Sequence, residues 1–246
     1  YDVEPEQFAG YMAKIVEMGA HVIGGCCGTT PAHIQKMVET TREMSVKPAT
    51  KKDITMVSSY GHAVILGGKP MIIGERINPT GKKLFKEALL RGDMDYILNQ
   101  ALEQIGAGAD ILDVNVGLPG IDEKEMMISA VKSIQAIVDV PLQVDSTIPE
   151  VLDAALRVYN GKPIVNSVNG EEKSLKAVLP LVKKYGAAVV GLTLDENGIP
   201  PKAEDRFKIA QRILERAQAI GIPKENVYID CLTLTASAEQ EGVMET

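Results

Sequence analysis

Apolar residues in the first 44 positions recur at helical spacing. One helix is predicted to begin near Pro5, and a second to begin at Thr30-Pro31, because proline is favoured in the first turn of a helix. A short apolar strand is predicted between them, at residues 21–23. We therefore assign residues 1–44 to one structural part.

The helical spacing of apolar residues ends after residue 44, and a different pattern of apolar residues follows a polar stretch. Residues 45–52 are polar, contain Pro48 and show no period, which is typical of a linker. We predict a linker over residues 45–64 and a second domain over residues 65–246. In that domain, short apolar runs alternate with amphipathic helical segments, as in a parallel sheet covered by helices. The predicted strands are residues 71–77, 109–115, 141–146, 163–168, 187–194 and 226–234.

Polar residues stand at or near the carboxyl end of nearly every predicted strand. This placement favours a (β/α)8 barrel, which builds its active site from many strand ends, over a doubly wound sheet, which concentrates its signal in one glycine-rich turn. Each such residue taken alone also suits the cap of the following helix. Six βα units are visible, and residues 235–246 resemble the start of a helix that is cut off. We therefore interpret the chain as an internal segment that carries about six units of an apparently truncated barrel.

Composition excludes several classes of protein. The formal net charge of −7 argues against a general role at nucleic acid or at a membrane surface, and no apolar run is long enough to span a bilayer. The chain has three cysteines and no signal sequence, which favours the reducing cytoplasm.

Several motifs together resemble the cobalamin-dependent methionine synthase family. The stretch GGCCGT at residues 24–29 is similar to the end of its homocysteine-binding barrel. The second domain is similar to its pterin-binding barrel, which binds methyltetrahydrofolate. The matching stretches of that domain are IGERINPTGKK, GADILDVNVGLPG, LQVDST and NSVNG, in this order. The resemblance implies that residues 1–44 are the end of one (β/α)8 barrel.

The adjacent cysteines of GGCCGT are candidate zinc ligands. Neighbouring side chains on a strand point to opposite faces, whereas a glycine-flanked turn can direct Cys26 and Cys27 to the same side. Zinc accepts thiolate ligands tetrahedrally, and a catalytic zinc keeps one position open for substrate. The resemblance implies a third cysteine upstream of this chain. Cys231 lies in the apolar predicted strand at residues 226–234, so we expect it to be a core residue. A buried, inert thiol pair is the alternative interpretation.

Carboxylate and amide side chains of the second domain are candidate ligands for the pterin. Carboxylates accept hydrogen bonds from ring N–H and amino groups, and amides both accept and donate. Asp145 and Asn166, on neighbouring predicted strands, are the strongest candidates. The full set of candidates for methyltetrahydrofolate is Glu75, Asn78, Asp113, Asn115, Asp145, Asn166, Asn169 and Asp230. No residue is identified as the acid that protonates N5.

The resemblance implies a methyltransferase that moves a methyl group from 5-methyltetrahydrofolate through cobalamin to zinc-activated homocysteine, giving methionine. Cobalamin would be carried by a separate domain, since the chain lacks the D-x-H-x-x-G motif of the family's corrinoid module. Three alternatives remain: a corrinoid methyltetrahydrofolate methyltransferase, dihydropteroate synthase, and a non-catalytic scaffold that binds zinc or a corrinoid protein.

Overall fold

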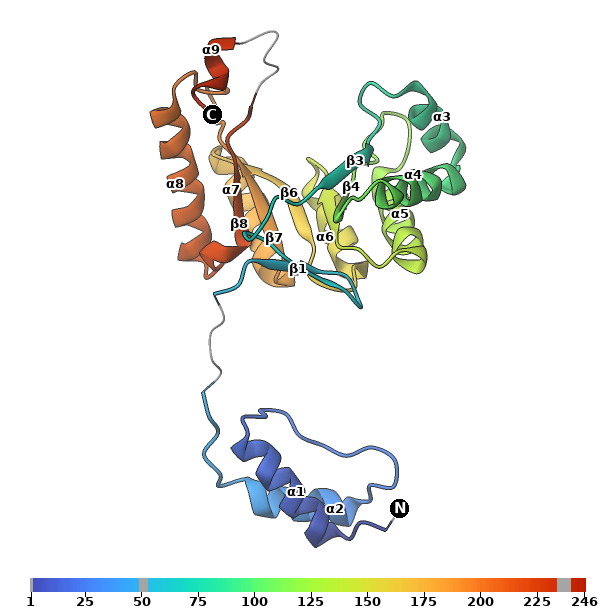
Figure 1. Cartoon of the computed structure of the whole chain (residues 1–246), viewed down its shortest axis with the longest axis vertical. Helices are drawn as coiled ribbons and strands as arrows, with labels where there is room; N and C mark the ends of the chain where they lie inside the picture. The colour runs from blue at the N-terminus through green and yellow to red at the C-terminus, as the bar shows by residue number, and fades with distance from the viewer. Residues whose placement is uncertain (1, 49–52, 234–239) are drawn as a thin grey trace. The chain divides into compact units, whose positions relative to one another are not determined.

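The computed structural model describes residues 2–48, 53–233 and 240–246 (Figure 1). Contacts within the chain form two compact units, Tyr1–Asp53 and Ile54–Thr246. Among the described residues, no helix is both long and apolar enough to cross a membrane.

Two helices form the regular secondary structure among the described residues of the first unit. Helices α1 (Pro5–Glu17) and α2 (Pro31–Thr41) each carry a proline in the first turn, as predicted, and pack against each other. The ring of His33 links the start of α2 to the chain before α1, because its Nε2 lies 2.8 Å from the carbonyl oxygen of Val3. The predicted strand at residues 21–23 is wrong: this segment is not a strand, and the described residues of the first unit contain no strand that could share backbone hydrogen bonds with it.

A short antiparallel hairpin opens the second unit. Strands β1 (Met56–Ser58) and β2 (Ala63–Ile65) pair with Val57 opposite Val64, and both valines are buried. The hairpin lies largely inside residues 45–64, which the sequence assigns to a linker. Strands of three residues are too short to display an alternating pattern, so they could not be predicted from the sequence.

Six parallel strands form the main sheet. They are β3 (Ile73–Ile77), β4 (Ile111–Val114), β5 (Leu142–Asp145), β6 (Ile164–Asn169), β7 (Ala188–Leu192) and β8 (Val227–Asp230). Each strand pairs with the next one in sequence, in the order β3-β4-β5-β6-β7-β8. Every crossover therefore steps in the same direction, whereas a doubly wound sheet reverses its order at a switch point. This winding confirms the predicted fold class, six βα units of the (β/α)8 type.

Helices follow the strands and cover one face of the sheet (Figure 1). They are α3 (Lys83–Arg91), α4 (Met94–Gly106), α5 (Glu123–Ile137), α6 (Pro149–Val158), α7 (Glu172–Tyr185) and α8 (Ala203–Ala219), with a short 3-10 turn η1 (Lys224–Asn226) before β8. Near the end of the chain, α9 (Gln240–Val243) is a single turn of the helix predicted at residues 235–246, and residues 234–239 lie outside the described residues.

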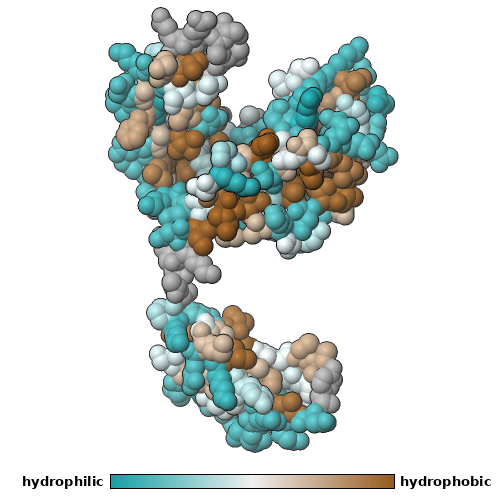
Figure 2. All heavy atoms as spheres, viewed as in Figure 1, coloured by the Kyte–Doolittle hydropathy of each residue, from teal (hydrophilic) through white to brown (hydrophobic). Residues whose placement is uncertain are grey.

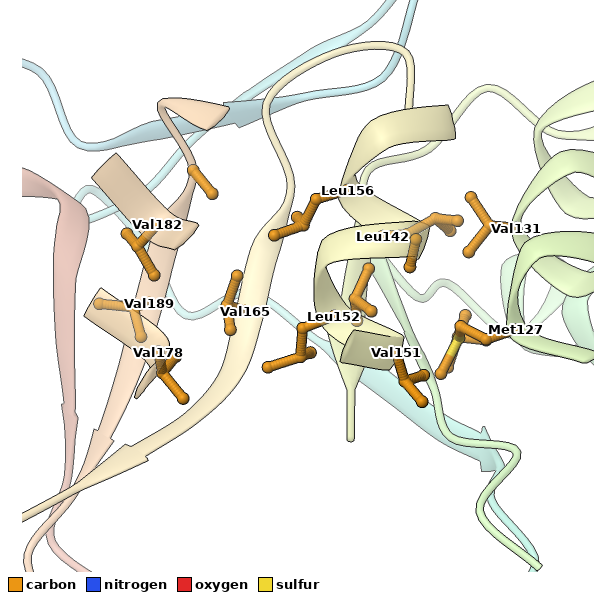
Figure 3. Close-up of a cluster of buried hydrophobic side chains, with 14 of the residues drawn as sticks. Met127, Val131, Leu142, Val151, Leu152, Leu156, Val165, Val178, Val182 and Val189 are labelled. Carbon is orange, nitrogen blue, oxygen red and sulfur yellow. The ribbon is translucent and has the colours of Figure 1, made fainter. Parts of the chain in front are cut away.

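The main core lies between the sheet and its helices. Alternate strand residues such as Leu142 and Val165 point toward α5, α6 and α7, where they meet Met127, Leu152 and Val182 (Figure 3). All five side chains are fully buried. The other set of alternate residues therefore lies on the inner face of the curved sheet.

An apolar layer closes the inner face at the amino ends of the strands. Val57 and Val64 of the hairpin pack there against Ile111, Ile164 and Ala188, the first inward residues of β4, β6 and β7. Backbone hydrogen bonds between Ser58 and Lys162 hold the hairpin beside the start of β6. The carboxyl ends of the strands, on the opposite side of this layer, hold the polar residues.

Candidate functional site

A buried carboxylate lies at the centre of the polar cluster. Asp113 on β4 and Gln143 on β5 are opposite each other in the strand register, and Nε2 of Gln143 donates a 2.6 Å hydrogen bond to Asp113 Oδ1. The same oxygen accepts a 3.2 Å hydrogen bond from Nδ2 of Asn166 on β6. Three neighbouring strands thus contribute one side chain each to this group.

The position of Asp113 changes its ionisation. Only 2% of the residue is exposed, and this burial, followed by the nearby charge of Asp145, raises the pKa of Asp113 to about 7. The hydrogen bonds from Gln143 and Asn166 act in the opposite direction, and the charge of Glu75 adds to the increase. Asp113 therefore exchanges its proton near neutral pH, far above the range of an exposed aspartate.

A second pair continues the cluster toward the strand ends. Nδ2 of Asn115 donates a 2.9 Å hydrogen bond to Asp145 Oδ2, and Asn115 Oδ1 accepts one from the backbone N–H of Gly117. Burial raises the pKa of Asp145, and the charges of Glu75 and Glu123 also raise it, while the Asn115 hydrogen bond lowers it. Asp145 is half-buried, so it is reached by solvent or ligand more easily than Asp113.

Two hollows adjoin these residues. One, of about 400 Å³, is lined by Asp145, Asn166 and Asn169. The other, of about 680 Å³, is lined by Asn115 and Glu123 among other residues. Both volumes fall in the range of small-molecule sites. The segment that begins at Asp145 lies between them, since Ser146 and Thr147 line both.

The other predicted pterin ligands have local hydrogen-bond partners. Glu75 is exposed and lies 3.2 Å from Lys82 Nζ, although its charge reaches both Asp113 and Asp145. Asn78 is buried, and its Oδ1 accepts a hydrogen bond from the backbone N–H of Thr80.

Two further predicted residues lie on later strands. Asn169 lines the 400 Å³ hollow and makes a turn with Glu171, whose backbone N–H donates to Asn169 Oδ1. Asp230 is exposed on β8, and its Oδ1 accepts a 2.7 Å hydrogen bond from the backbone N–H of Leu232. No described contact joins Asp230 to Asp113 or Asp145.

Sequence reasoning missed two residues of the cluster. Gln143 stands two positions before Asp145 on the same strand, so alternation places both on the inner face, and this signal was available. Glu123, in the first turn of α5, accepts a 2.5 Å hydrogen bond from Ser146 Oγ. No strand-end pattern points to Glu123, because it belongs to a helix.

The cysteine pair of the first unit lies in a tight turn. The backbone N–H of Thr29 donates to the carbonyl of Cys26, and Thr29 Oγ1 accepts from the N–H of Cys26. Gly28 adopts a φ of 81°, and a Cβ atom at Gly25 would overlap the Thr29 side chain, so the turn requires glycine at both positions.

The two sulfur atoms are close together and exposed. Cys26 Sγ and Cys27 Sγ lie 3.6 Å apart, near the ~3.8 Å that separates two thiolates on a tetrahedral zinc with Zn–S bonds of ~2.3 Å. Hydrogen bonds from the backbone and side chain of Cys27 lower the pKa of the Cys26 thiol. The pair thus fits two positions of a zinc site. The described residues contain no group of three potential metal ligands, and Cys231 belongs to the other unit.

Comparisons with protein families divide the chain in the same way as its contacts. Residues 74–244 match the family described as "Pterin binding enzyme". Residues 1–41 match the family described as "Homocysteine S-methyltransferase".

Curated relatives cover both regions at once. The chain is 34% identical to "Methionine synthase" of Mycobacterium leprae and 33% identical to that of Mycobacterium tuberculosis. Each alignment covers 98% of this chain but only 21% of the relative. The chain thus spans about a fifth of the length of these relatives.

Solved structures share the fold of the second unit. Dihydropteroate synthase of Yersinia pestis superposes with a TM-score of 0.58 at 20% identity, covering 77% of this chain and 69% of that chain. The enzyme of Xanthomonas albilineans gives a TM-score of 0.56 at 23% identity, covering 78% and 70%. At this identity the likeness concerns the fold alone. The family match over residues 74–244, on a parallel sheet with a polar cluster at its carboxyl ends, shows that the chain belongs to the pterin-binding enzyme family.

Proposed function

We propose that this chain is part of a methyltransferase that moves a methyl group from 5-methyltetrahydrofolate, through cobalamin, to zinc-activated homocysteine, giving methionine. The observation that carries the proposal is the hydrogen-bonded cluster of Asp113, Asn115, Asp145 and Asn166 inside a pterin-binding fold. The relatives named methionine synthase support it, since they match both units of the chain.

In the proposed pterin site, two carboxylates and two amides receive the 2-amino-4-oxo edge of the ring. Ionised Asp145 accepts from a ring N–H or from the amino group, and it is fixed for this role by Asn115. Asn166 has an amide oxygen to accept and an N–H to donate, so it can pair with the amino group or with the carbonyl. Asn169 lines the same hollow and joins this set. Glu75, Asn78 and Asp230 contribute at its edges, through charge or through the turns they stabilise.

In the proposed thiol site, Cys26 and Cys27 would supply two of the zinc ligands. Bound zinc would keep the homocysteine sulfur deprotonated near neutral pH, where a free thiol is mostly protonated. The turn holds the two Sγ atoms 3.6 Å apart on one side of the backbone, so little rearrangement would be needed to bind the metal.

Cobalamin would reach the chain on a separate domain. No described residue offers a feature by which a corrinoid could be assigned to a position in either unit. We therefore name no residue of this chain as its ligand.

Spectroscopy of cobalamin tests the proposal. The chain is mixed with cob(I)alamin and 5-methyltetrahydrofolate, and the conversion to methylcobalamin is followed by its absorption. We expect conversion that depends on the chain and that falls by at least about tenfold in Asp145→Asn, because a charged hydrogen bond is lost.

Three other outcomes would redirect the assignment. Condensation of a dihydropterin pyrophosphate with 4-aminobenzoate, without methyl transfer, would identify a dihydropteroate synthase. Binding of zinc or a corrinoid protein without either reaction would identify a scaffold. Methyl transfer to cobalamin without later transfer to homocysteine would leave a corrinoid methyltransferase.

A further inference from the structure

Gln143 is a buried residue of the second unit with an amide side chain, and it is not one of the predicted site residues. It is 7% exposed and lies on β5, directly across from Asp113 on β4. Its Nε2 donates a 2.6 Å hydrogen bond to Asp113 Oδ1, whereas its own Oε1 is buried and has no partner among the described residues. An ionised carboxylate accepts hydrogen bonds only, so the amide must present its N–H to Asp113.

The hydrogen bonds on Asp113 are unevenly distributed. Oδ1 accepts from both Gln143 and Asn166, at 2.6 and 3.2 Å. Oδ2 is buried and has no partner among the described residues. A buried carboxylate oxygen without a donor is costly, so this atom is the one left to be paired by a bound molecule.

We propose that Gln143 is a positioning residue for pterin binding: it holds Asp113 Oδ1 so that Oδ2 is the oxygen offered to the N–H groups of the ring. This inference rests on the proposed function. Gln143 acts through Asp113, which it contacts from the neighbouring strand.

The groups around Asp113 determine how its pKa would change if Gln143 were removed. Asp145 on β5 and Glu75 on β3 both disfavour a negative charge on Asp113, and Lys82 is paired with Glu75. Glu123, at the start of α5, acts on Asp145. The hydrogen bonds from Gln143 and Asn166 are what favour the ionised form, so removing Gln143 raises the pKa of Asp113 further.

The experiment measures 5-methyltetrahydrofolate binding to the full chain by titration calorimetry between about pH 6 and about pH 8.5, on either side of the neutral range. In the unchanged protein, affinity should rise with pH through about 7, as Asp113 loses its proton and can accept from the ring. In Gln143→Leu we expect the midpoint of this rise to move up by about one pH unit, with about tenfold weaker binding near neutral pH. Gln143→Asn keeps an amide but retracts it by one methylene, and it should shift the midpoint in the same direction.

Gln135→Leu is the matched control. Gln135 lies on the helix α5, and its amide bonds the backbone of Val131, Val158 and Asn160, away from the cluster. This variant should lose thermal stability without moving the pH midpoint of binding.

Each outcome has a distinct meaning. If the unchanged chain does not bind 5-methyltetrahydrofolate, the proposed function is wrong and the role of Gln143 is wrong with it. If the unchanged chain binds and both Gln143 variants retain its affinity and midpoint, only the role of Gln143 is wrong. If circular dichroism shows that Gln143→Leu does not fold, Gln143→Asn decides.

Discussion

The two units bury their apolar residues to very different extents. In the first unit, the buried apolar residues among those described are Ala9, Val16 and Met37, while Met18 and Val22 are 82% and 92% exposed. The second unit has a continuous core between its sheet and helices. Figure 2 shows apolar side chains reaching the surface in both units. Among the described residues, however, it is the second unit that has a packed interior able to hold a polar group away from water.

Their candidate sites differ in the same way. The sulfur atoms of Cys26 and Cys27 are exposed, and a local turn sets their geometry. Asp113 is buried, and residues from neighbouring strands set its geometry. A local turn can thus bring two thiols together without a core, whereas the perturbed ionisation of a carboxylate requires one.

The largest expected contrast is in the cost of removing an apolar side chain. Leu152→Ala in the second unit deletes a fully buried side chain and should lower the free energy of unfolding by about 2–5 kcal/mol. Ile15→Ala in the first unit removes a side chain that is 38% exposed and should cost less than about 1 kcal/mol. Urea unfolding followed by circular dichroism measures both. An equal loss of unfolding free energy in both variants would show that the two units do not differ in the packing of their apolar side chains.

The second-largest expected effect concerns the stability cost of the buried charge on Asp113. The pKa of Asp113 is raised from 3.8 to about 7, so the native state favours the protonated form, and stability is lost as the pH rises through about 7. Asp113→Asn is neutral at every pH and keeps an oxygen for Gln143 and Asn166. We expect it to raise the free energy of unfolding at about pH 8 by about 2–4 kcal/mol and to change it little at about pH 4.

Urea unfolding of both proteins at several pH values measures this difference. Parallel stability curves for Asp113→Asn and the unchanged chain would show that Asp113 is ionised normally. The variant should also bind 5-methyltetrahydrofolate more weakly, since it cannot become a carboxylate.

A smaller effect is expected on ligand affinity. Asp145→Asn should weaken 5-methyltetrahydrofolate binding by about 1.5–3 kcal/mol, because the amide lacks the charge of the carboxylate. Asp195→Asn is the control, since the Asp195 carboxylate bonds the backbone N–H of Asn197 in a local turn. Titration calorimetry on both variants would contradict the assignment of Asp145 if their affinities were equal.

The smallest expected effect on stability is at the thiol pair. Cys26→Ser and Cys27→Ser replace exposed side chains and should change the free energy of unfolding by less than about 0.5 kcal/mol. Each should nevertheless reduce binding of Co²⁺, a spectroscopic substitute for zinc, as measured by the thiolate absorption. Unchanged Co²⁺ binding in both variants would mean that the pair is not a metal site.

The sequence by itself determined the succession of elements in the second unit. Apolar runs of four or more residues alternate with helical periods there, and these local patterns placed all six parallel strands. Alternation along a strand also places Asp113 and Asn115 on one face, so a polar inner surface followed from the sequence. The hairpin of β1 and β2 lies in the predicted linker, because such short strands are defined by pairing with each other and with Lys162 rather than by pattern.

Only the tertiary structure decided which of the strand-end groups meet. Asn78 and Asp230 carry the same signal as Asp113 and Asp145, yet their side chains bond the backbone of Thr80 and Leu232. The register between β4 and β5 brings Gln143 to Asp113, and it depends on contacts between residues 30 positions apart in the sequence. The pKa of Asp113 depends on burial and on the neighbouring charge of Asp145, which no local stretch of sequence encodes.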